Sequence, residues 1–149
     1  RGDAPGARPL GALMIDDSRR SARRQAVFLL YQRDVTGLSL AELEDNVVRD
    51  RGADLDLFTR EVVDGVVAGE ADIDALVDGA ASGWSVDRIA PLERNILRVA
   101  VYEIRDRADV PVAVAIDEAV GLAKRYCQAD AGKFVNGILG TIARRGGGG

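Results

Sequence analysis

Three consecutive segments repeat apolar residues at the spacing of an α-helix, and this repetition constrains the fold more than any other feature of the chain. The segments span residues 91–107, 112–126 and 131–143. Their apolar residues are Leu92, Ile96, Leu97, Val99, Ala100, Val101 and Ile104 in the first, Ile116, Ala119, Val120 and Ala123 in the second, and Phe134, Val135, Ile138, Leu139 and Ile142 in the third. Pro91 suits the first turn of a helix. We expect the first segment to form a central, largely buried helix.

The residues before position 90 also carry signals for helix ends. Asp17 or Ser18 can cap a helix that runs to about Val35, before Gly37. Ser39, followed three positions later by Glu42, forms a capping box for a helix through about Arg51.

An acidic stretch over residues 54–81 predicts further helix, divided into two pieces by its interior glycines. These glycines are Gly65, Gly69 and Gly79. Residues 83–85 predict a turn, followed by one short helical turn to Ile89. Asp130 is expected to cap the last helix.

The expected fold is all-α, with about seven helices in one domain over residues 18–143. A strand is not expected, because Pro111 interrupts the one β-branched run, residues 110–114. Residues 1–17 are expected to be a disordered extension and residues 144–149 a flexible tail. Aromatic residues make up only 5% of the chain, so the core should consist of Ala, Val, Leu and Ile.

The composition excludes most catalytic and metal chemistry. There is no His, which rules out His-based triads and proton transfer, and the single Cys127 permits neither an internal disulfide nor a Cys/His zinc site. No glycine-rich phosphate loop is present. We therefore expect no catalytic residue, cofactor or metal. A lone thiol and the lack of a long apolar run indicate a cytoplasmic protein that does not meet a membrane.

The charge is unevenly distributed along the chain. The net charge is −4, yet residues 19–24 hold four arginines, Arg19, Arg20, Arg23 and Arg24. Residues 40–80 hold twelve acidic residues against three arginines, a local balance of −9. Because charges about 8 Å apart or more are largely screened, a local basic patch can bind a polyanion on an acidic protein.

These four arginines are the first candidate binding residues. Placed in the first turns of a helix, they would oppose the helix dipole, which favours a role in binding an anion. Guanidinium groups bind phosphate through two hydrogen bonds and stack on bases, as single-stranded RNA requires. The alternative is a solvated charged face, which is the usual role of a charge run.

The second candidate is the start of the last helix. Gly132 permits close approach by another chain, while Lys133 and Phe134 offer a cation for phosphate and a ring for base stacking. The residues alone favour the alternative, in which Phe134 belongs to the core and Lys133 is solvated.

Polar residues within the apolar stripes need partners if they are buried. We expect Arg98 and Glu118 to pair across two helices, and a general acid or base role for Glu118 lacks a second catalytic group. Cys127 is expected to be inert, and Trp84 to anchor the two halves of the molecule.

Several motifs resemble the NusB family of transcription antitermination factors, and the resemblance covers about residues 18–143. The run over residues 96–103 (ILRVAVYE) resembles the central helix of the family, and residues 133–139 (KFVNGIL) resemble its terminal signature. Residues 109–111 and 114–124, and the arginine-rich helix leading into residues 26–31, complete the pattern. The acidic region over residues 40–80 matches no motif of the family.

The resemblance implies an all-α fold of two helical subbundles and a function in transcription antitermination. The implied ligand is boxA, a short single-stranded element of ribosomal RNA leader transcripts. The implied partner is NusE, a small-subunit ribosomal protein, within an RNA polymerase antitermination complex. The matching positions imply RNA-binding roles for one set of residues and partner-binding roles for another. The first set is Arg19, Arg20, Arg23, Arg24, Asp130, Lys133 and Phe134, and the second is Tyr31, Asp87 and Glu93. Monomer and homodimer both remain open.

Two alternatives remain at this point. A NusB-like domain also forms the N-terminal part of a ribosomal RNA cytosine methyltransferase, so the chain could be a fragment of such an enzyme. The other alternative is a helical protein-interaction module without an RNA role, in which the arginines would not affect RNA affinity.

Overall fold

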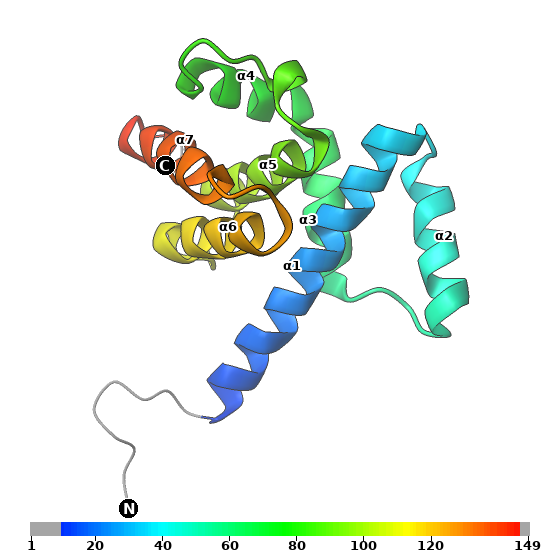
Figure 1. Ribbon diagram of the computed structural model, residues 1–149. Coiled ribbons are helices and arrows are strands. Elements are labelled where there is room, and N and C mark those ends of the chain that lie inside the picture. The colour runs from blue at the N-terminus through cyan, green and yellow to red at the C-terminus, as the bar shows by residue number, and fades with distance from the viewer. Residues whose placement is uncertain (1–9, 147–149) are drawn as a thin grey trace, which may run out of the picture.

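Seven α-helices and one 3-10 turn make up the described part of the chain (Figure 1), in agreement with the all-α prediction. The computed structural model describes the backbone of residues 10–146 and the side chains of residues 18–146. The helices are α1 (Leu10–Thr36), α2 (Leu40–Arg51), α3 (Leu57–Ala68), α4 (Glu70–Ala80), α5 (Pro91–Asp106), α6 (Val112–Tyr126) and α7 (Ala131–Arg144), with the 3-10 turn η1 (Val86–Arg88) between α4 and α5. No helix among the described residues is both long and apolar enough to cross a membrane.

The start of α1 differs from the prediction. The helix begins at Leu10 rather than near Ser18, so the expected disordered extension overlaps with helix over residues 10–17. The reason is local: Ala12, Leu13 and Met14 are strong helix formers, and nothing after them stops the helix. Residues 1–9 and 147–149, which complete the two predicted tails, lie outside the described residues.

The ends of α1 and α2 confirm the capping signals. Gly37 follows α1 with a φ of +74°, a conformation that favours glycine. At the start of α2, the Glu42 N–H donates to Ser39 Oγ at 3.1 Å, and the Ser39 N–H donates to Glu42 Oε1 at 3.2 Å. These two hydrogen bonds satisfy N–H groups that a helix start otherwise leaves unpaired.

The acidic stretch divides at one of its three glycines. Gly69 separates α3 from α4, whereas Gly65 lies inside α3 and Gly79 inside α4. Helix α3 starts at Leu57, three residues after Asp54. The prediction that the stretch forms two helices is confirmed, and Gly69 is the point where they divide.

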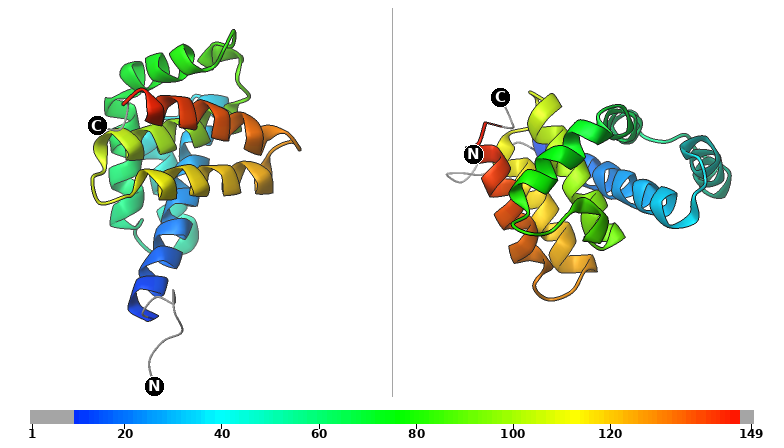
Figure 2. Two further views of the ribbon diagram at one scale, coloured as in Figure 1. Left: turned by 90° about the vertical axis from the view of Figure 1, so that its left-hand side faces the viewer. Right: turned by 90° about the horizontal axis from the view of Figure 1, so that it is seen from above.

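Helix α5 is the centre of the molecule, as its periodicity predicts. It packs against α1, α3, α4, α6 and α7, and all its residues from 95 to 104 are buried. Helices α2 and α3 pack on α1, while α6 and α7 pack on each other and on α5. Figure 2 shows α4, α6 and α7 on one side of α1 and α2 on the other, which gives two helical groups joined by α5 and α1.

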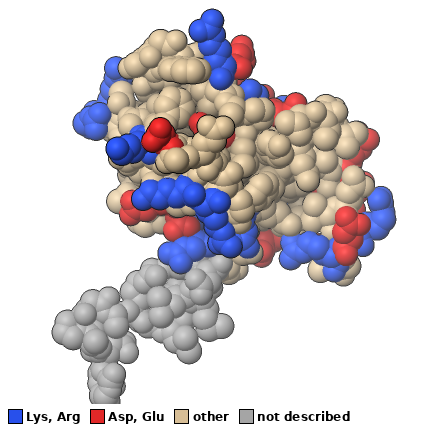
Figure 3. All heavy atoms as spheres, viewed as in Figure 1, with Lys and Arg blue, Asp and Glu red and all other residues tan. Residues whose placement is uncertain are grey.

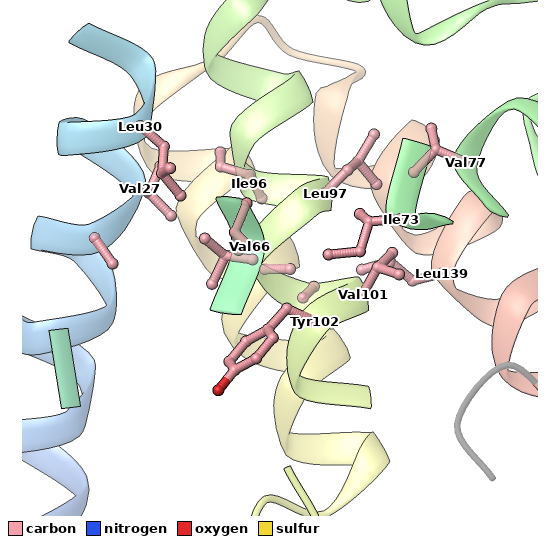
Figure 4. Packing of buried hydrophobic residues seen from close by; sticks show 14 of the residues in the cluster. Val27, Leu30, Val66, Ile73, Val77, Ile96, Leu97, Val101, Tyr102 and Leu139 are labelled. Carbon is pink, nitrogen blue, oxygen red and sulfur yellow. The ribbon is translucent and has the colours of Figure 1, made fainter. Parts of the chain in front are cut away.

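The core is aliphatic, as expected. Figure 4 shows side chains of five helices meeting around α5: Val27 and Leu30 of α1, Val66 of α3, Ile73 and Val77 of α4, Ile96, Leu97, Val101 and Tyr102 of α5, and Leu139 of α7. Full burial of one such aliphatic side chain stabilises the fold by about 1.5–3 kcal/mol. The same contacts fix the positions of the surface residues discussed below.

Replacing Gly65 with alanine is expected to destabilise the protein. A Cβ at this position would overlap the ring of Tyr102, which is buried, so the ring or the helix would have to shift. Overpacking of this kind costs about 1–3 kcal/mol, which exceeds the roughly 1 kcal/mol that alanine gains over glycine inside a helix. Urea unfolding of the variant measures the difference.

Gly121→Ala is the matched control, because Gly121 lies inside α6 with open space around the position of a Cβ. This variant should be more stable than the wild type by up to about 1 kcal/mol. Equal stabilisation by both substitutions would contradict the close packing of Tyr102 on α3.

Candidate nucleic-acid interface

The arginine cluster lies on the described start of α1, against α6 and the loop before it. Arg19 Nη2 donates to Asp109 Oδ2 at 2.7 Å, and Arg20 Nε donates to Glu118 Oε2 at 2.9 Å. The Arg20 side chain remains 57% exposed. Since α1 begins at Leu10, these arginines lie more than two turns inside the helix, and the predicted opposition to the helix dipole does not apply.

Arg23 points into the protein instead. It is only 4% exposed and donates two hydrogen bonds to the carboxylate of Glu103, at 2.8 and 2.7 Å. Its Nη1 also lies 3.5 Å from Glu118 Oε1. A two-point pair of this kind is strong and specific in geometry, so Arg23 joins α1 to α5 and α6 and does not present its charge to solvent.

Arg24 is the arginine of the cluster that makes no ion pair within the described residues. It is half-buried and lines a groove of about 310 Å³ between α1 and α2, with Arg51 and Asp56 also in the lining. Arg51 donates to the neutral Gln25 at 3.0 Å. Arg24 therefore has the capacity to bind an incoming anion without first losing an internal partner.

The guanidinium groups of three arginines lie over the ring of Phe58. Arg19, Arg23 and Arg107 lie 4.8, 5.5 and 5.1 Å from its centroid, within range of cation–π attraction. Hydrogen bonds from Arg107, and to a lesser degree from Arg19, hold the pKa of Asp109 well below its usual range. Asp109 thus stays charged and keeps Arg19 in place. The sequence gives no signal for this arrangement, because Phe58 lies on another helix.

A second surface forms where α7 begins. Phe134, Asp130 and Glu93 line one groove of about 490 Å³ together with Trp84 and Arg88. The rings of Trp84 and Phe134 meet edge to face, with centroids 6.4 Å apart and planes at 74°. Burial raises the pKa of Glu93. The structure thus brings together residues from two separate parts of the sequence, residues 84–93 and 128–134.

The other predicted residues lie around this groove or away from it. Lys133 is exposed beside Phe134, and Asp87 is exposed in η1, next to Arg88. Tyr31 is half-buried on α1 and does not line the groove. Asp130 precedes α7, but its side chain makes no capping hydrogen bond, so that part of the prediction is wrong.

Trp84 is the residue that the sequence analysis placed incorrectly. It was expected to anchor the two halves of the molecule, yet it is 52% exposed at the mouth of the groove. Its position in a turn after Gly83, rather than on a helical stripe, is the signal that could have indicated exposure.

The two surfaces lie toward opposite ends of α6. Glu118, which binds Arg20, belongs to the first half of the helix, whereas Gln128 of the groove comes two residues after its last residue, Tyr126. The helix rises about 12 Å between Glu118 and Tyr126. Lys124 and Arg125 are exposed between them. Figure 3 shows basic side chains gathered over α6, α7 and the described start of α1, with acidic side chains interspersed.

The predicted Arg98–Glu118 pair is wrong. Arg98 donates to both carboxylate oxygens of Asp74, at 2.8 and 2.9 Å, and to Asp34 at 2.9 Å. Glu118 instead binds Arg20 and Arg23. The two residues face different neighbours because α5 is buried on every side, and a stripe of apolar residues does not reveal which side faces α6.

No group of three His, Cys, Asp or Glu side chains within the described residues is arranged to hold a metal ion. Cys127 is half-buried, and burial, with a smaller effect of Glu93, raises the pKa of its thiol. A thiol of this kind is a poor nucleophile at neutral pH. The features that remain for function are the cationic end of α1 and the aromatic groove.

Comparison with known proteins gives a consistent picture. Residues 20–144 match the profile of the NusB family. The chain is 40% identical to the transcription antitermination protein NusB of Beutenbergia cavernae, covering 85% of this chain and 90% of the relative. It is 44% identical to the protein of the same name from Rubrobacter xylanophilus, covering 82% of this chain and 87% of the relative.

Solved structures show the same likeness. NusB from T. maritima superposes with a TM-score of 0.76 at 34% identity, covering 85% of this chain and 90% of that one. A crystal structure of the antitermination factors NusB and NusE in complex with double-stranded RNA contains a chain with a TM-score of 0.76 at 31% identity, covering 85% of this chain and 96% of that one.

Proposed function

The chain belongs to the NusB family, and on this premise we propose that it binds boxA-type single-stranded RNA of ribosomal RNA leader transcripts together with the ribosomal protein NusE. As a member of the family it is a transcription antitermination protein and not an enzyme. The related chain from the crystal structure of NusB and NusE with double-stranded RNA supports NusE and RNA as partners, while the single-stranded boxA element is proposed from the resemblance to the family. The joint complex would act on RNA polymerase in the cytoplasm, where transcripts are made.

The observation that carries the proposal is the cationic end of α1 on an acidic protein. Arg20 is mostly exposed, and Arg24 has no ion pair within the described residues. Arg19 and Arg20 are held by carboxylates at the surface, and an RNA phosphate can replace such a carboxylate with little loss, because exposed ion pairs contribute only about 0–1 kcal/mol. Arg23 contributes to RNA binding indirectly, because its buried pair with Glu103 fixes α1 against α5 and α6.

The groove at the start of α7 would read the bases. Phe134 offers a ring, Lys133 a cation for phosphate, and Asp130 an acceptor for hydrogen bonds from a base edge. Tyr31, Asp87 and Glu93 would contact NusE near the same region. Two weak surfaces joined in one complex give a tighter site than either alone. The free protein is proposed to be a monomer or a homodimer.

The double variant Arg20→Ala/Arg24→Ala is expected to bind boxA-like RNA about tenfold more weakly at low salt, since it loses two charge-assisted contacts to phosphate. The slope of log affinity against log salt should become shallower by about 0.7 for each lost contact. Fluorescence anisotropy of a labelled oligomer over a salt series, with and without NusE, measures both quantities.

Arg144→Ala/Arg145→Ala is the control of equal charge, because both arginines are exposed at the far end of α7. It should leave affinity and salt slope unchanged. If the double variant and this control behave alike, the arginines of α1 do not bind the RNA backbone, and the proposed surface is wrong.

A further inference from the structure

Trp84 is an exposed aromatic residue held in a fixed position. Its backbone N–H donates to Ala81 O at 2.9 Å, and the preceding Gly83 has a φ of +83° that closes the turn. Trp84 is 52% exposed, and tryptophan is enriched at binding interfaces. The ring of Phe134 meets that of Trp84 at 74°, with the centroids 6.4 Å apart, and both residues line the groove.

The segment that follows Trp84 is pinned to the body of the protein. The Val86 N–H donates to Asp78 at 2.6 Å. Arg94 donates to the carbonyl oxygens of Val86 and Ile89, at 3.1 and 3.0 Å. The turn that carries Trp84 is therefore a rigid support, and a ligand that stacks on the ring does not have to order it first.

The groove beside the ring carries hydrogen-bonding groups of both kinds. Arg88 and Gln128 can donate, while Asp130 can accept. Arg88 makes no ion pair within the described residues and can also bind phosphate, as can Lys133 beside the groove. A half-exposed aromatic ring next to donors, acceptors and cations matches one class of ligand, the unstacked base of a single-stranded nucleic acid with its phosphate. The volume of about 490 Å³ is in the range of pockets that hold one small ring system.

We propose that Trp84 is an RNA-binding residue on which one unstacked base of the strand stacks, with Phe134 closing the edge of the stack. The inference rests on the proposed function, since the strand is the RNA that the α1 arginines bind. It extends the RNA contact from the α1 end of α6 to the turn between α4 and η1. A peptide segment of the protein partner is the competing occupant, and the test separates the two.

Trp84 is the only tryptophan of the chain, so its intrinsic fluorescence reports on the groove directly. Titration with an unlabelled single-stranded boxA-like RNA should quench this fluorescence with the same midpoint as the anisotropy of the labelled oligomer. Trp84→Ala should weaken RNA binding by about 5- to 100-fold, the range of one lost base–aromatic stack, and Trp84→Phe should recover part of the loss. The salt slope should not change, because stacking releases no counterions.

Leu57→Ala is the matched control, since Leu57 is 70% exposed on α3 and should leave RNA affinity unchanged. RNA binding by the wild type without quenching, and with equal affinity for Trp84→Ala, would overturn the inference and leave the proposed function intact. A fluorescence change on adding NusE alone, with RNA affinity insensitive to Trp84→Ala, would assign the groove to the protein partner and also overturn it. No RNA binding by the wild type, even with NusE, would overturn both proposals.

Discussion

Glu103→Ala is expected to lower the free energy of unfolding by about 3–5 kcal/mol, the usual cost of removing one partner from a buried ion pair. Glu103 is fully buried and accepts two hydrogen bonds from Arg23. Without the carboxylate, the Arg23 guanidinium keeps only Glu118, at 3.5 Å, inside the protein. The loss is a substantial part of the roughly 5–15 kcal/mol that stabilises a typical domain. Urea unfolding followed by circular dichroism measures it.

The double variant Arg23→Met/Glu103→Leu separates the charge effect from the packing effect. Removing both charges leaves no unpaired buried group, so its stability should be close to that of the wild type. If Arg23 serves only to position α1, this variant should also bind RNA with an unchanged salt slope. A shallower slope would instead show that the Arg23 guanidinium reaches the RNA backbone, which its burial argues against.

The helices were predictable because their signals are local. The capping box of Ser39 and Glu42, the position of Pro91 and the stop at Gly37 each depend on a few neighbouring residues, and each lies where the sequence places it. Helix α1 starts earlier than expected because the Gly- and Pro-rich composition that predicts disorder does not continue through residue 17. The helix formers at residues 12–14 were the better signal.

The partners of the buried charges were not predictable in the same way. Periodicity identifies the apolar face of a helix, but α5 is buried on all sides from residue 95 to 104, so its sequence does not show which neighbour each polar residue meets. For this reason the periodicity of α5 does not identify Glu103 as the partner of Arg23. A charged residue between Tyr102 and Ile104 in a central helix must be paired, and this rule could have singled it out.

The candidate site, too, is predictable from the sequence only in part. The arginines and Phe134 were identified from residue type and from resemblance to the family, whereas the groove that unites Phe134 with Trp84 exists only in the folded chain.

The known relatives distinguish between antitermination and the alternative of an rRNA methyltransferase fragment. The two relatives at 40% and 44% identity are antitermination proteins, and the chain covers about nine-tenths of each, which favours antitermination over methyl transfer.

Arg98→Met is the second substitution with a large expected effect, a loss of about 3 kcal/mol in the free energy of unfolding. Arg98 is buried and joins α5 to α4 through Asp74 and to α1 through Asp34. Although burial opposes the charge, the hydrogen bonds and charge of Asp74, followed by the charges of Asp34 and Glu70, raise the pKa of Arg98 above its usual value. The methionine fills the space of the aliphatic stem and leaves Asp74 without the cation that binds both of its oxygens.

A double-mutant cycle shows whether the loss comes from this contact. Asp74→Asn alone should cost less than Arg98→Met, because Arg98 retains Asp34 at 2.9 Å. Asp34 in turn is also bound by Arg94 and Asn95, so it stays paired when Arg98 is removed. The combined variant should therefore cost less than the sum of the two single variants, with a coupling energy of about 1–3 kcal/mol. Additive losses would mean that Arg98 stabilises the fold through its stem alone, and that the joint between α1, α4 and α5 does not depend on its charge.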